Sequence, residues 1–333
     1  MQLPAVSVLL PYTNEGELLQ EAIQSILQQS FTDFELLLVA NRADDHTLNI
    51  ASSFNDQRIV RINETRSGIV YALNAGLRMA RGEWIARMDA DDIAHPERLQ
   101  KQITFLTTHT DIDAVACGTT LFPATADNLG YQLFVEWQNS LLTPEEHAVN
   151  RFIESPVAHP AMVFRKKLID QLGDYSNEEL PEDYELWLRW MDNGKKIAKL
   201  NEKLLFWRDR PQRLSRTALQ YAEQSFFEVK ARYLKSYFDQ HPDQPKKIIV
   251  CGGSSNNRWK IETLLRHGIP VTAVTDVVNR NTAPLPFIPA QMLPSFTDAF
   301  VINLIAKRDA RESIKSYLAS CGFMAGKNCI MAG

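Results

Sequence analysis

Cysteine is scarce in this chain, and excess basic charge and long apolar runs are missing altogether. The four cysteines among 333 residues lie far apart and include no C-x-x-C pair, so neither a structural zinc site nor a dense disulfide framework is indicated. The formal net charge of -4 argues against a nucleic-acid-binding protein. No apolar run approaches the ~20 residues of a membrane span, and the first residues lack the basic segment and cleavage site of a signal peptide. These absences predict a protein of the reducing cytoplasm that does not bind nucleic acid.

Apolar runs alternate with helix-period segments through the first third of the chain, which predicts an α/β fold. We expect strands over 6–10, 34–39, 58–62 and 84–88, and helices beginning near residue 14 and over 47–54, 69–80 and 96–107. This alternation indicates right-handed βαβ units and a mostly parallel central sheet flanked by helices. Ligands of such sheets bind beyond the carboxyl ends of the strands. We therefore expect the polar loops at 12–15, 41–45 and 89–92 to gather at one edge.

The length of the chain suggests two domains. From about Ala114 the strands become sparser, with an irregular stretch through Glu136, and a long helical pattern over 217–238 is broken by the segment 241–245. We predict a first domain over 1–216, a helical linker over 217–245 and a small second domain over 246–333.

The second domain resembles a small Rossmann-like α/β domain. Gly252 keeps the first glycine of a G-x-G-x-x-G turn, but Ser254 and Asn257 replace the other two, which hinders close approach to a pyrophosphate. Asp276 lies near the end of the second strand, where a ribose-binding acid is expected. A structural, oligomerising or regulatory module is favoured over a redox site.

Three carboxylates, Asp89, Asp91 and Asp92, follow the predicted strand 84–88. Side chains alternate along an extended segment, so Asp89 and Asp91 should point the same way. Such a pair attracts Mg²⁺ or Mn²⁺, whose remaining ligands come from water and substrate phosphates. The alternative is an acidic helix start, because aspartate stabilises helix N-termini and Pro96 suits a first helical position. The segment alone leaves both interpretations open.

Further short motifs are specific in their order and separation. They are Val6 to Glu15, Arg66 to Gly68 with Ala72 to Gly76, Ala80 to Asp92 with His95 to Leu99, His159-Pro160, and Pro181 to Trp187. With this set the chain resembles the inverting family 2 glycosyltransferases, which have a GT-A fold. The match runs from about Val6 to Ser215, roughly two-thirds of the chain.

The resemblance assigns chemical roles to two acidic pairs. It implies that Asp89 and Asp91 bind the metal, with Asp91 the direct ligand, and that this metal stabilises the leaving nucleoside diphosphate. It implies that Asp183 is the catalytic base for the acceptor hydroxyl, with Glu182 as the second candidate. The alternatives are that Glu182 and Asp183 only stabilise a helix N-terminus and that Asp92 is a helix cap.

The donor site is expected on the loops after the first strands. The candidates for nucleotide-sugar binding are Pro11, Tyr12, Glu15, Asn41, Asp45, Arg66, Asp89, Ala90, Asp91 and Arg210. The sequence departs from its relatives at Asn41, where the family usually has an aspartate pair, but an amide still bonds a nucleobase and a UDP-sugar is favoured. It departs again at Arg210, where many relatives have histidine. Arginine suits the diphosphate rather than a metal, with a solvated basic loop as the alternative; for Asp45 the alternative is a helix cap.

These residues together predict a metal-dependent inverting glycosyltransferase. It would use Mn²⁺ or Mg²⁺ and move a sugar from a nucleotide-diphosphate sugar to a hydroxyl of a glycan or lipid-linked glycan. One alternative is a sugar nucleotidyltransferase, although such an enzyme needs a glycine-rich phosphate loop that residues 11–15 lack. Another is a noncatalytic sensor that binds a sugar nucleotide, which the altered loop at Asn41 leaves open. The resemblance points to bacterial surface polysaccharide synthesis in the cytoplasm or at the inner face of the membrane. It leaves open peripheral membrane association and homo-oligomerisation through the C-terminal domain.

Overall fold

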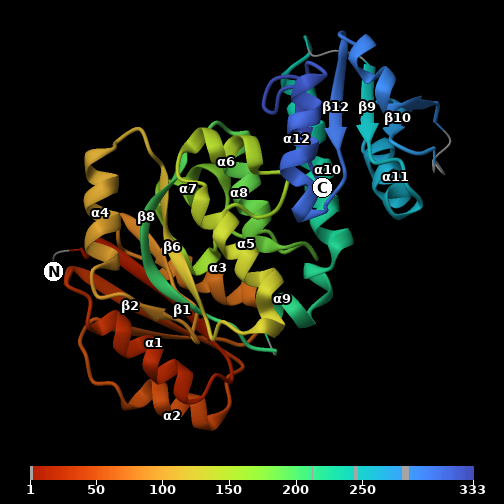
Figure 1. Cartoon of the computed structure of the whole chain (residues 1–333). Coiled ribbons are helices and arrows are strands. Elements are labelled where there is room, and N and C mark those ends of the chain that lie inside the picture. Colours follow the sequence, from red (N-terminus) through yellow and green to blue (C-terminus); the bar gives the residue numbers. More distant parts are fainter. Residues whose placement is uncertain (1–2, 212, 244–246, 280–284) are drawn as a thin grey trace. The chain divides into compact units, whose positions relative to one another are not determined.

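The computed structural model describes residues 3–211, 213–243, 247–279 and 285–333, which divide into two compact units (Figure 1). The first unit contains the residues up to 147 together with 156–218, and the second contains 148–155 and the residues from 219 onward. Helix α10 (Glu223–Gln240) therefore belongs to the second unit, whereas a separate linker was predicted over 217–245. The reason is an apolar face that buries Phe227, Ala231 and Leu234. The predicted boundary at 244–246 lies outside the described residues.

The first unit is built on an eight-stranded, mostly parallel sheet with the strand order β3-β2-β1-β4-β7-β6-β8-β5. Its strands are β1 (Val6–Tyr12), β2 (Phe34–Asn41), β3 (Ile59–Glu64), β4 (Trp84–Arg87), β5 (Ile93–Ala94), β6 (Ala114–Phe122), β7 (Met162–Arg165) and β8 (Ile197–Arg208). Strands β1 to β4 are parallel to one another, and β7 runs antiparallel to both β4 and β6. Every residue of β1 and β2 is buried, which explains their continuous apolar runs.

Helices cover both faces of this sheet. They are α1 (Glu17–Leu27), α2 (Asp45–Ser53), α3 (Ile69–Met79), α4 (Arg98–Thr108), α5 (Leu129–Ser140), α6 (Pro144–Asn150), α7 (Lys167–Leu172), α8 (Glu182–Asp192) and α9 (Leu214–Thr217). Figure 1 shows α1 and α2 on one side of β1 and β2 and α3 on the other. This follows from right-handed crossovers that first step outward from β1 to β3 and then return to β4.

Two predicted segments of the first unit differ in the structure. Helix α4 begins at Arg98 rather than Pro96, because the backbone N–H of Glu97 donates to Nδ1 of His95 and the segment before Arg98 forms a turn. The stretch predicted to be irregular through Glu136 contains most of α5. Only Val135 and Gln138 of α5 are buried, so its sequence shows little helical periodicity.

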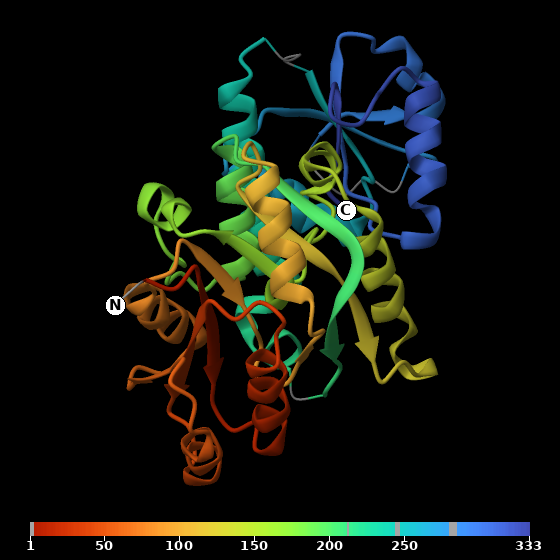
Figure 2. The ribbon, with the colours of Figure 1, turned by 90° about the vertical axis from the view of Figure 1, so that its left-hand side faces the viewer.

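The second unit contains a five-stranded sheet in which all the strands are parallel. Its elements after α10 are β9 (Lys247–Cys251), α11 (Arg258–Arg266), β10 (Val271–Asp276), β11 (Phe287–Pro289), β12 (Ala299–Asn303), α12 (Arg311–Ser320) and β13 (Cys329–Met331). The strand order is β11-β10-β9-β12-β13, so the chain runs outward from β9 in one direction and then in the other, as in a Rossmann-like fold. Figure 2 shows α10 and α12 on opposite sides of this sheet. Among the described helices, none combines the length and apolar character of a membrane span.

Candidate active site

The polar loops that follow β1, β2 and β4 meet at the carboxyl edge of the first sheet, as predicted. The strands are parallel and in register, with Leu9 opposite Arg87 and Tyr12 opposite Ala40. The side chain of Asn14 accepts a hydrogen bond from the backbone N–H of Asp44 at 2.9 Å, which joins the first loop to the second. The edge therefore presents side chains from three loops to one region.

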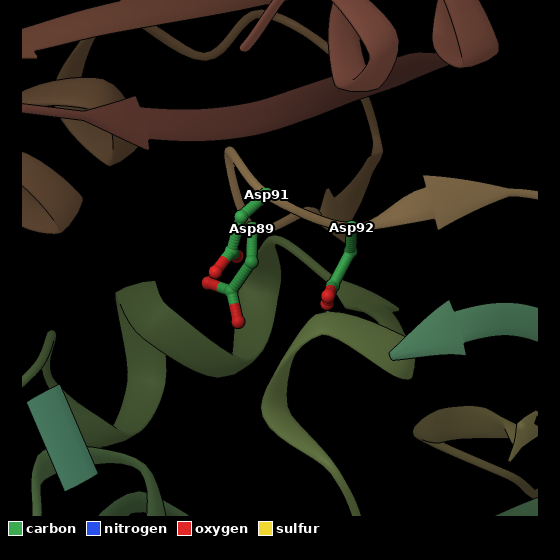
Figure 3. Close-up of side chains that lie close together, drawn as sticks. All are labelled: Asp89, Asp91 and Asp92. Carbon is green, nitrogen blue, oxygen red and sulfur yellow. The ribbon is translucent and has the colours of Figure 1, made fainter. Parts of the chain in front are cut away.

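Asp89, Asp91 and Asp92 form a compact acidic cluster just beyond β4. One carboxylate oxygen from each lies within 4.8 Å of the other two. Figure 3 shows the carboxylates of Asp89 and Asp91 side by side, with that of Asp92 slightly apart. Burial and the charge of Asp89 raise the pKa of Asp91, and burial together with both neighbours raises that of Asp92 well above its usual range. This excess of negative charge favours a cation.

Arginines already neutralise part of the cluster. Nε of Arg210 donates to Oδ2 of Asp91 at 2.8 Å, and NH2 of Arg87 donates to Oδ1 of Asp89 at 2.5 Å. In each ion pair one partner is largely buried: the Arg87 side chain is 2% exposed and the Asp91 side chain is 15% exposed. The solvated-loop alternative for Arg210 is therefore wrong, because its guanidinium binds the metal-ligand candidate Asp91.

Asp92 does not cap a helix, so that alternative for this residue is also wrong. Its Oδ1 accepts a hydrogen bond from the backbone N–H of Arg208 at 2.8 Å, which fixes the loop after β4 to the end of β8. Its Oδ2 is buried and has no hydrogen-bond partner. An orphaned buried carboxylate oxygen beside Asp89 and Asp91 is a hard ligand atom, and so the cluster fits Mg²⁺ or Mn²⁺.

Glu182 and Asp183 form the first turn of α8, as their sequence predicts. Oδ1 of Asp183 accepts the backbone N–H of Tyr184 at 2.7 Å. Burial, and then the neighbouring charge of Glu182, raise the pKa of Asp183 to about 7, with a further contribution from Asp89. The charge of Asp89, a member of the acidic cluster, is thus one of the causes of the raised pKa. A carboxyl of this pKa accepts a proton near neutral pH far better than an ordinary aspartate.

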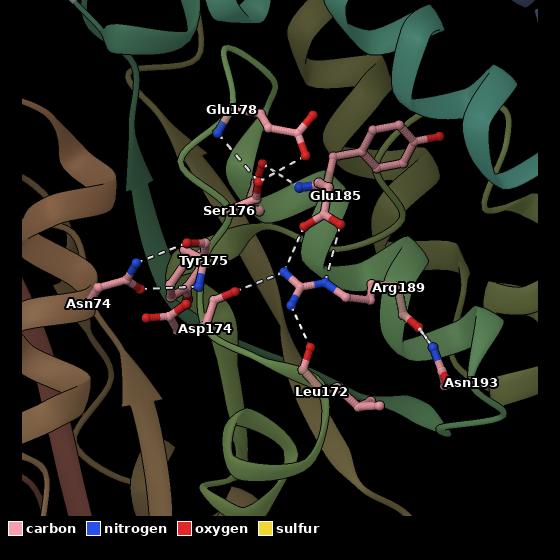
Figure 4. A network of polar contacts seen from close by, with 11 residues as sticks. Asn74, Leu172, Asp174, Tyr175, Ser176, Glu178, Glu185, Arg189 and Asn193 are labelled. Carbon is pink, nitrogen blue, oxygen red and sulfur yellow. Dashed lines mark hydrogen bonds and ion pairs between the residues drawn. The ribbon is translucent and has the colours of Figure 1, made fainter.

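A hydrogen-bonded network holds the loop before α8 (Figure 4). The side chain of Asn74 on α3 donates to the carbonyl of Tyr175 at 2.9 Å and accepts its N–H at 3.1 Å. Arg189 pairs with Glu185 at 2.7 Å and donates to the carbonyls of Leu172 and Asp174. These contacts join α3, the loop and α8, and thereby fix the start of α8 where Asp183 lies.

Asn41, a predicted nucleobase contact, holds the loop after β3. Its Nδ2 donates to the carbonyls of Arg66 at 2.6 Å and Glu64 at 3.3 Å, and its Oδ1 accepts the N–H of Gly68 at 3.0 Å. Gly68 has a φ of 129°, a conformation that favours glycine. Both donors of the Asn41 amide are thus used within the protein. The side chain of Arg66 forms a bidentate pair with Glu64 and lies over the ring of Tyr71.

The other donor-site candidates lie at the same edge. Pro11 and Tyr12 are buried at the end of β1, and Ala90 is buried within the acidic loop. Burial is the main cause that raises the pKa of Glu15, and the charge of Asp91 raises it further. Asp45 is exposed at the first position of α2 and does not cap it.

The cap of α2 is Asp44, whose side chain accepts the backbone N–H of Thr47 at 2.7 Å. The cap alternative for Asp45 is therefore wrong, and the role belongs to its neighbour.

A family model described as "Glycosyl transferase family 2" matches residues 7–173. The chain belongs to glycosyltransferase family 2.

Relatives agree with this assignment. The glycosyltransferase is 30% identical over 238 residues to the UDP-Gal:alpha-D-GlcNAc-diphosphoundecaprenol beta-1,3-galactosyltransferase of Escherichia coli, covering 69% of this chain and 82% of that protein. It is 29% identical over 230 residues to the O-antigen biosynthesis glycosyltransferase WbnJ of Escherichia coli, covering 66% and 86%.

Two solved structures share the fold. TarS 1–349 of S. aureus, in complex with UDP-GlcNAc, aligns with a TM-score of 0.54 at 17% identity, covering 70% of this chain and 72% of that one. The mannosyltransferase PcManGT of Pyrobaculum calidifontis, in complex with GDP-Man and Mn²⁺, aligns with a TM-score of 0.50 at 16% identity, covering 97% and 87%. The predicted GT-A type α/β fold is confirmed.

Two residues of the glycosyltransferase's candidate site were missed by the sequence analysis. Arg87 is a buried charged residue at the end of the otherwise apolar strand β4, two positions before Asp89, and its place there was a signal for a buried ion pair. Arg213 interacts electrostatically with Asp89, Asp91 and Asp92. It was visible only as part of a basic run, and its proximity to the cluster depends on contacts distant in the sequence.

Proposed function

We propose that this glycosyltransferase moves a sugar, with inversion, from a nucleotide-diphosphate sugar to a hydroxyl of a glycan or lipid-linked glycan. A UDP-sugar is the favoured donor, and the divalent ion is Mn²⁺ or Mg²⁺. The observation that carries the proposal is a cation-attracting cluster of three carboxylates in the same unit as Asp183, a buried carboxyl whose pKa the charge of Asp89 helps to raise. One relative is named for its use of UDP-galactose, which supports a UDP-sugar donor. Another is named for O-antigen biosynthesis, which supports a role in bacterial polysaccharide synthesis.

Asp89 and Asp91 would hold the metal ion, which supplies positive charge to the leaving nucleoside diphosphate. Arg210, at 2.8 Å from Asp91, is placed to share that role: its planar guanidinium can leave the carboxylate for two phosphate oxygens once a cation neutralises Asp91. Its positive charge would thus offset the charge of Asp91 in the free protein and that of the diphosphate in the donor complex.

Asp183 would accept the proton of the acceptor hydroxyl as that oxygen attacks the anomeric carbon. The sugar's bond to the diphosphate breaks on the opposite face, so the configuration inverts. Glu182 would affect this step through its charge, which raises the pKa of Asp183. Transfer of this proton in the transition state is typically worth about 10²- to 10⁴-fold in rate.

Nucleotide binding is tested by thermal unfolding of the whole chain with UDP, GDP, dTDP and CDP, each with Mn²⁺ or EDTA. Ligand at ~100 times its dissociation constant stabilises by roughly 2.7 kcal/mol. We expect a Mn²⁺-dependent shift with UDP that Asp91→Ala removes. The control Asp111→Ala, which breaks an exposed pair with Lys196, should keep the shift. A shift unaffected by Asp91→Ala would contradict the metal assignment.

Catalysis is tested separately by donor consumption with a panel of glycan and lipid-linked acceptors. Asp183→Asn should bind UDP as the wild type does and lose about 10²- to 10⁴-fold in kcat. Nucleotide binding without turnover on any acceptor would favour a noncatalytic sensor, and release of pyrophosphate would indicate a nucleotidyltransferase.

A further inference from the structure

The second unit has a crevice of about 550 Å³ at the carboxyl ends of its strands. Strand β9 lies between β10 and β12, and the chain leaves β9 toward β10 but returns beyond it to β12. Such a reversal separates the two loops that follow the central strands and opens a space between them. The crevice lies at this point, because its lining comes from the segments that follow β9, β10 and β12. None of its residues belongs to the site of the first unit.

The loop after β9 forms one wall of this crevice. Gly252 has a φ of 103°, and a Cβ atom there would lie 2.9 Å from both Nδ2 of Asn257 and Cγ1 of Ile305. A side chain at this position is therefore excluded both by conformation and by space. The glycine brings the backbone of the loop close to Ile305, across the crevice on the segment after β12.

The side chain of Asn257 limits what can bind against this loop. Its Nδ2 donates to the carbonyl of Gly252 at 3.0 Å, so it folds back over the turn. A dinucleotide fold has glycine at this position, which allows close helix–strand packing beside the pyrophosphate. With Asn257 in that space, close approach of a pyrophosphate is disfavoured and a ligand with a single phosphate fits better.

Charged groups lie on both sides of the central strand. Lys260, on the first turn of α11, has a side chain that is only 7% exposed, and its Nζ pairs with Glu223 at 2.7 Å. Lys307 lines the crevice after β12. On the other side Asp276 ends β10, and its Oδ1 accepts the backbone N–H of Val277 at 2.8 Å, which orients the carboxylate. Glu223 also lines the crevice. A ligand that spans the crevice thus meets a lysine paired with Glu223 near β9, Lys307 near β12 and the carboxylate of Asp276 at β10.

We propose that this crevice binds a single 5′-phosphorylated ribonucleoside, separately from the donor site of the first unit. The carboxylate of Asp276 accepts hydrogen bonds from the ribose hydroxyls, and the phosphate lies between the loop after Gly252 and the lysines at 260 and 307. The volume falls within the ~300–1,000 Å³ of small-molecule sites. Because the loop after β9 disfavours a pyrophosphate, the expected ligand is a nucleoside 5′-monophosphate.

The proposal is tested by isothermal titration of the full chain, in EDTA, with AMP, GMP, CMP and UMP and with their 2′-deoxy counterparts. UDP serves as the diphosphate comparison. Ala306→Trp fills the crevice from an exposed position. Its matched control, Ala319→Trp, places the same side chain at an exposed position of α12 outside the crevice. Asp276→Ala removes the ribose contact, and its control, Asp298→Ala, removes an exposed carboxylate before the amino end of β12.

We expect at least one ribonucleotide to bind the wild type, with about a tenfold loss of affinity in Asp276→Ala and a larger loss in Ala306→Trp. The two controls and Asp91→Ala should bind as the wild type does. The preference for ribose over 2′-deoxyribose should disappear in Asp276→Ala.

Binding that persists in Ala306→Trp, or is lost in Asp91→Ala, would assign the nucleotide to the first unit and overturn the proposal. The absence of any binding would also overturn it, as would equal affinities of the wild type for the ribonucleotides and for their 2′-deoxy counterparts. Tighter binding of UDP than of UMP would also contradict a ligand with a single phosphate.

Discussion

The rate of sugar transfer should depend on the ionisation of Asp183. Burial and the neighbouring Glu182 raise the pKa of Asp183 to about 7, so a base at this position would be about one-tenth ionised near pH 6 and nine-tenths ionised near pH 8. kcat/KM should therefore rise roughly tenfold over this interval. With an ordinary aspartate of pKa about 3.9, it would stay flat. Glu182→Gln removes the adjacent negative charge, lowers the pKa of Asp183 and moves the rising limb to lower pH.

The assay is the pH profile of kcat/KM for the donor, measured with saturating acceptor for the wild type, Glu182→Gln and the control Glu179→Gln. Glu179 is an exposed carboxylate in the loop before α8, so its removal should leave the profile unchanged. Asp183→Asn should have low activity, and its kcat/KM should not rise between pH 6 and pH 8. A flat wild-type profile, or a limb that stays in place in Glu182→Gln, would refute the reasoning that the two adjacent carboxyls set the proton-transfer step.

Three further substitutions test other parts of the structure. Arg210→Ala should tighten Mn²⁺ binding by about tenfold, because it removes the cation that competes for Asp91. The control Arg216→Ala should leave Mn²⁺ binding unchanged. Calorimetric titration with Mn²⁺ measures both affinities, and weaker binding in Arg210→Ala would argue against competition. Asn41→Ala should raise the KM for the donor several-fold with little change in kcat, since the loop after β3 loses its support; a lower kcat at unchanged KM would count against that role. Burial lowers the pKa of Lys230 from 10.5 to about 7, so the unfolded chain binds more protons between these values and the stability of the folded chain should rise with pH across this window. In Lys230→Met this rise should be smaller when the melting temperature is followed from about pH 7 to about pH 10, and equal slopes would show that the group does not contribute.

Local patterns were sufficient to predict the features that depend on neighbouring residues. The alternation of apolar strands and helices gave the order of elements at the start of the first unit, because buried parallel strands need continuous apolar side chains. Asp183 was expected at a helix start, because the apolar spacing after it has the helical period. The edge at which the loops gather then followed from the parallel arrangement.

Contacts between distant residues were beyond such patterns. Arg210 and Asp91 are 119 residues apart, and Asn74 and Tyr175 are 101 residues apart. The sequence assigned the amide of Asn41 to a nucleobase, but backbone groups from the next strand's loop use both of its donors. Partners of a polar side chain are set by tertiary packing, so a sequence reveals which groups need a partner but not which partner they find.

The short segment 148–155 has a consequence for how this protein can be divided or recombined. It interrupts the first unit in sequence but belongs to the second, where Phe152 and Ile153 are buried. Lys230 donates to the carbonyl of Ile153 at 2.7 Å, and Arg308 pairs with Glu154 at 2.7 Å. A chain ending at residue 218 would leave these apolar side chains without their partners. Recombination that exchanged one unit without the other would therefore break these contacts. During synthesis, this segment can reach its final place only after Arg308 has left the ribosome.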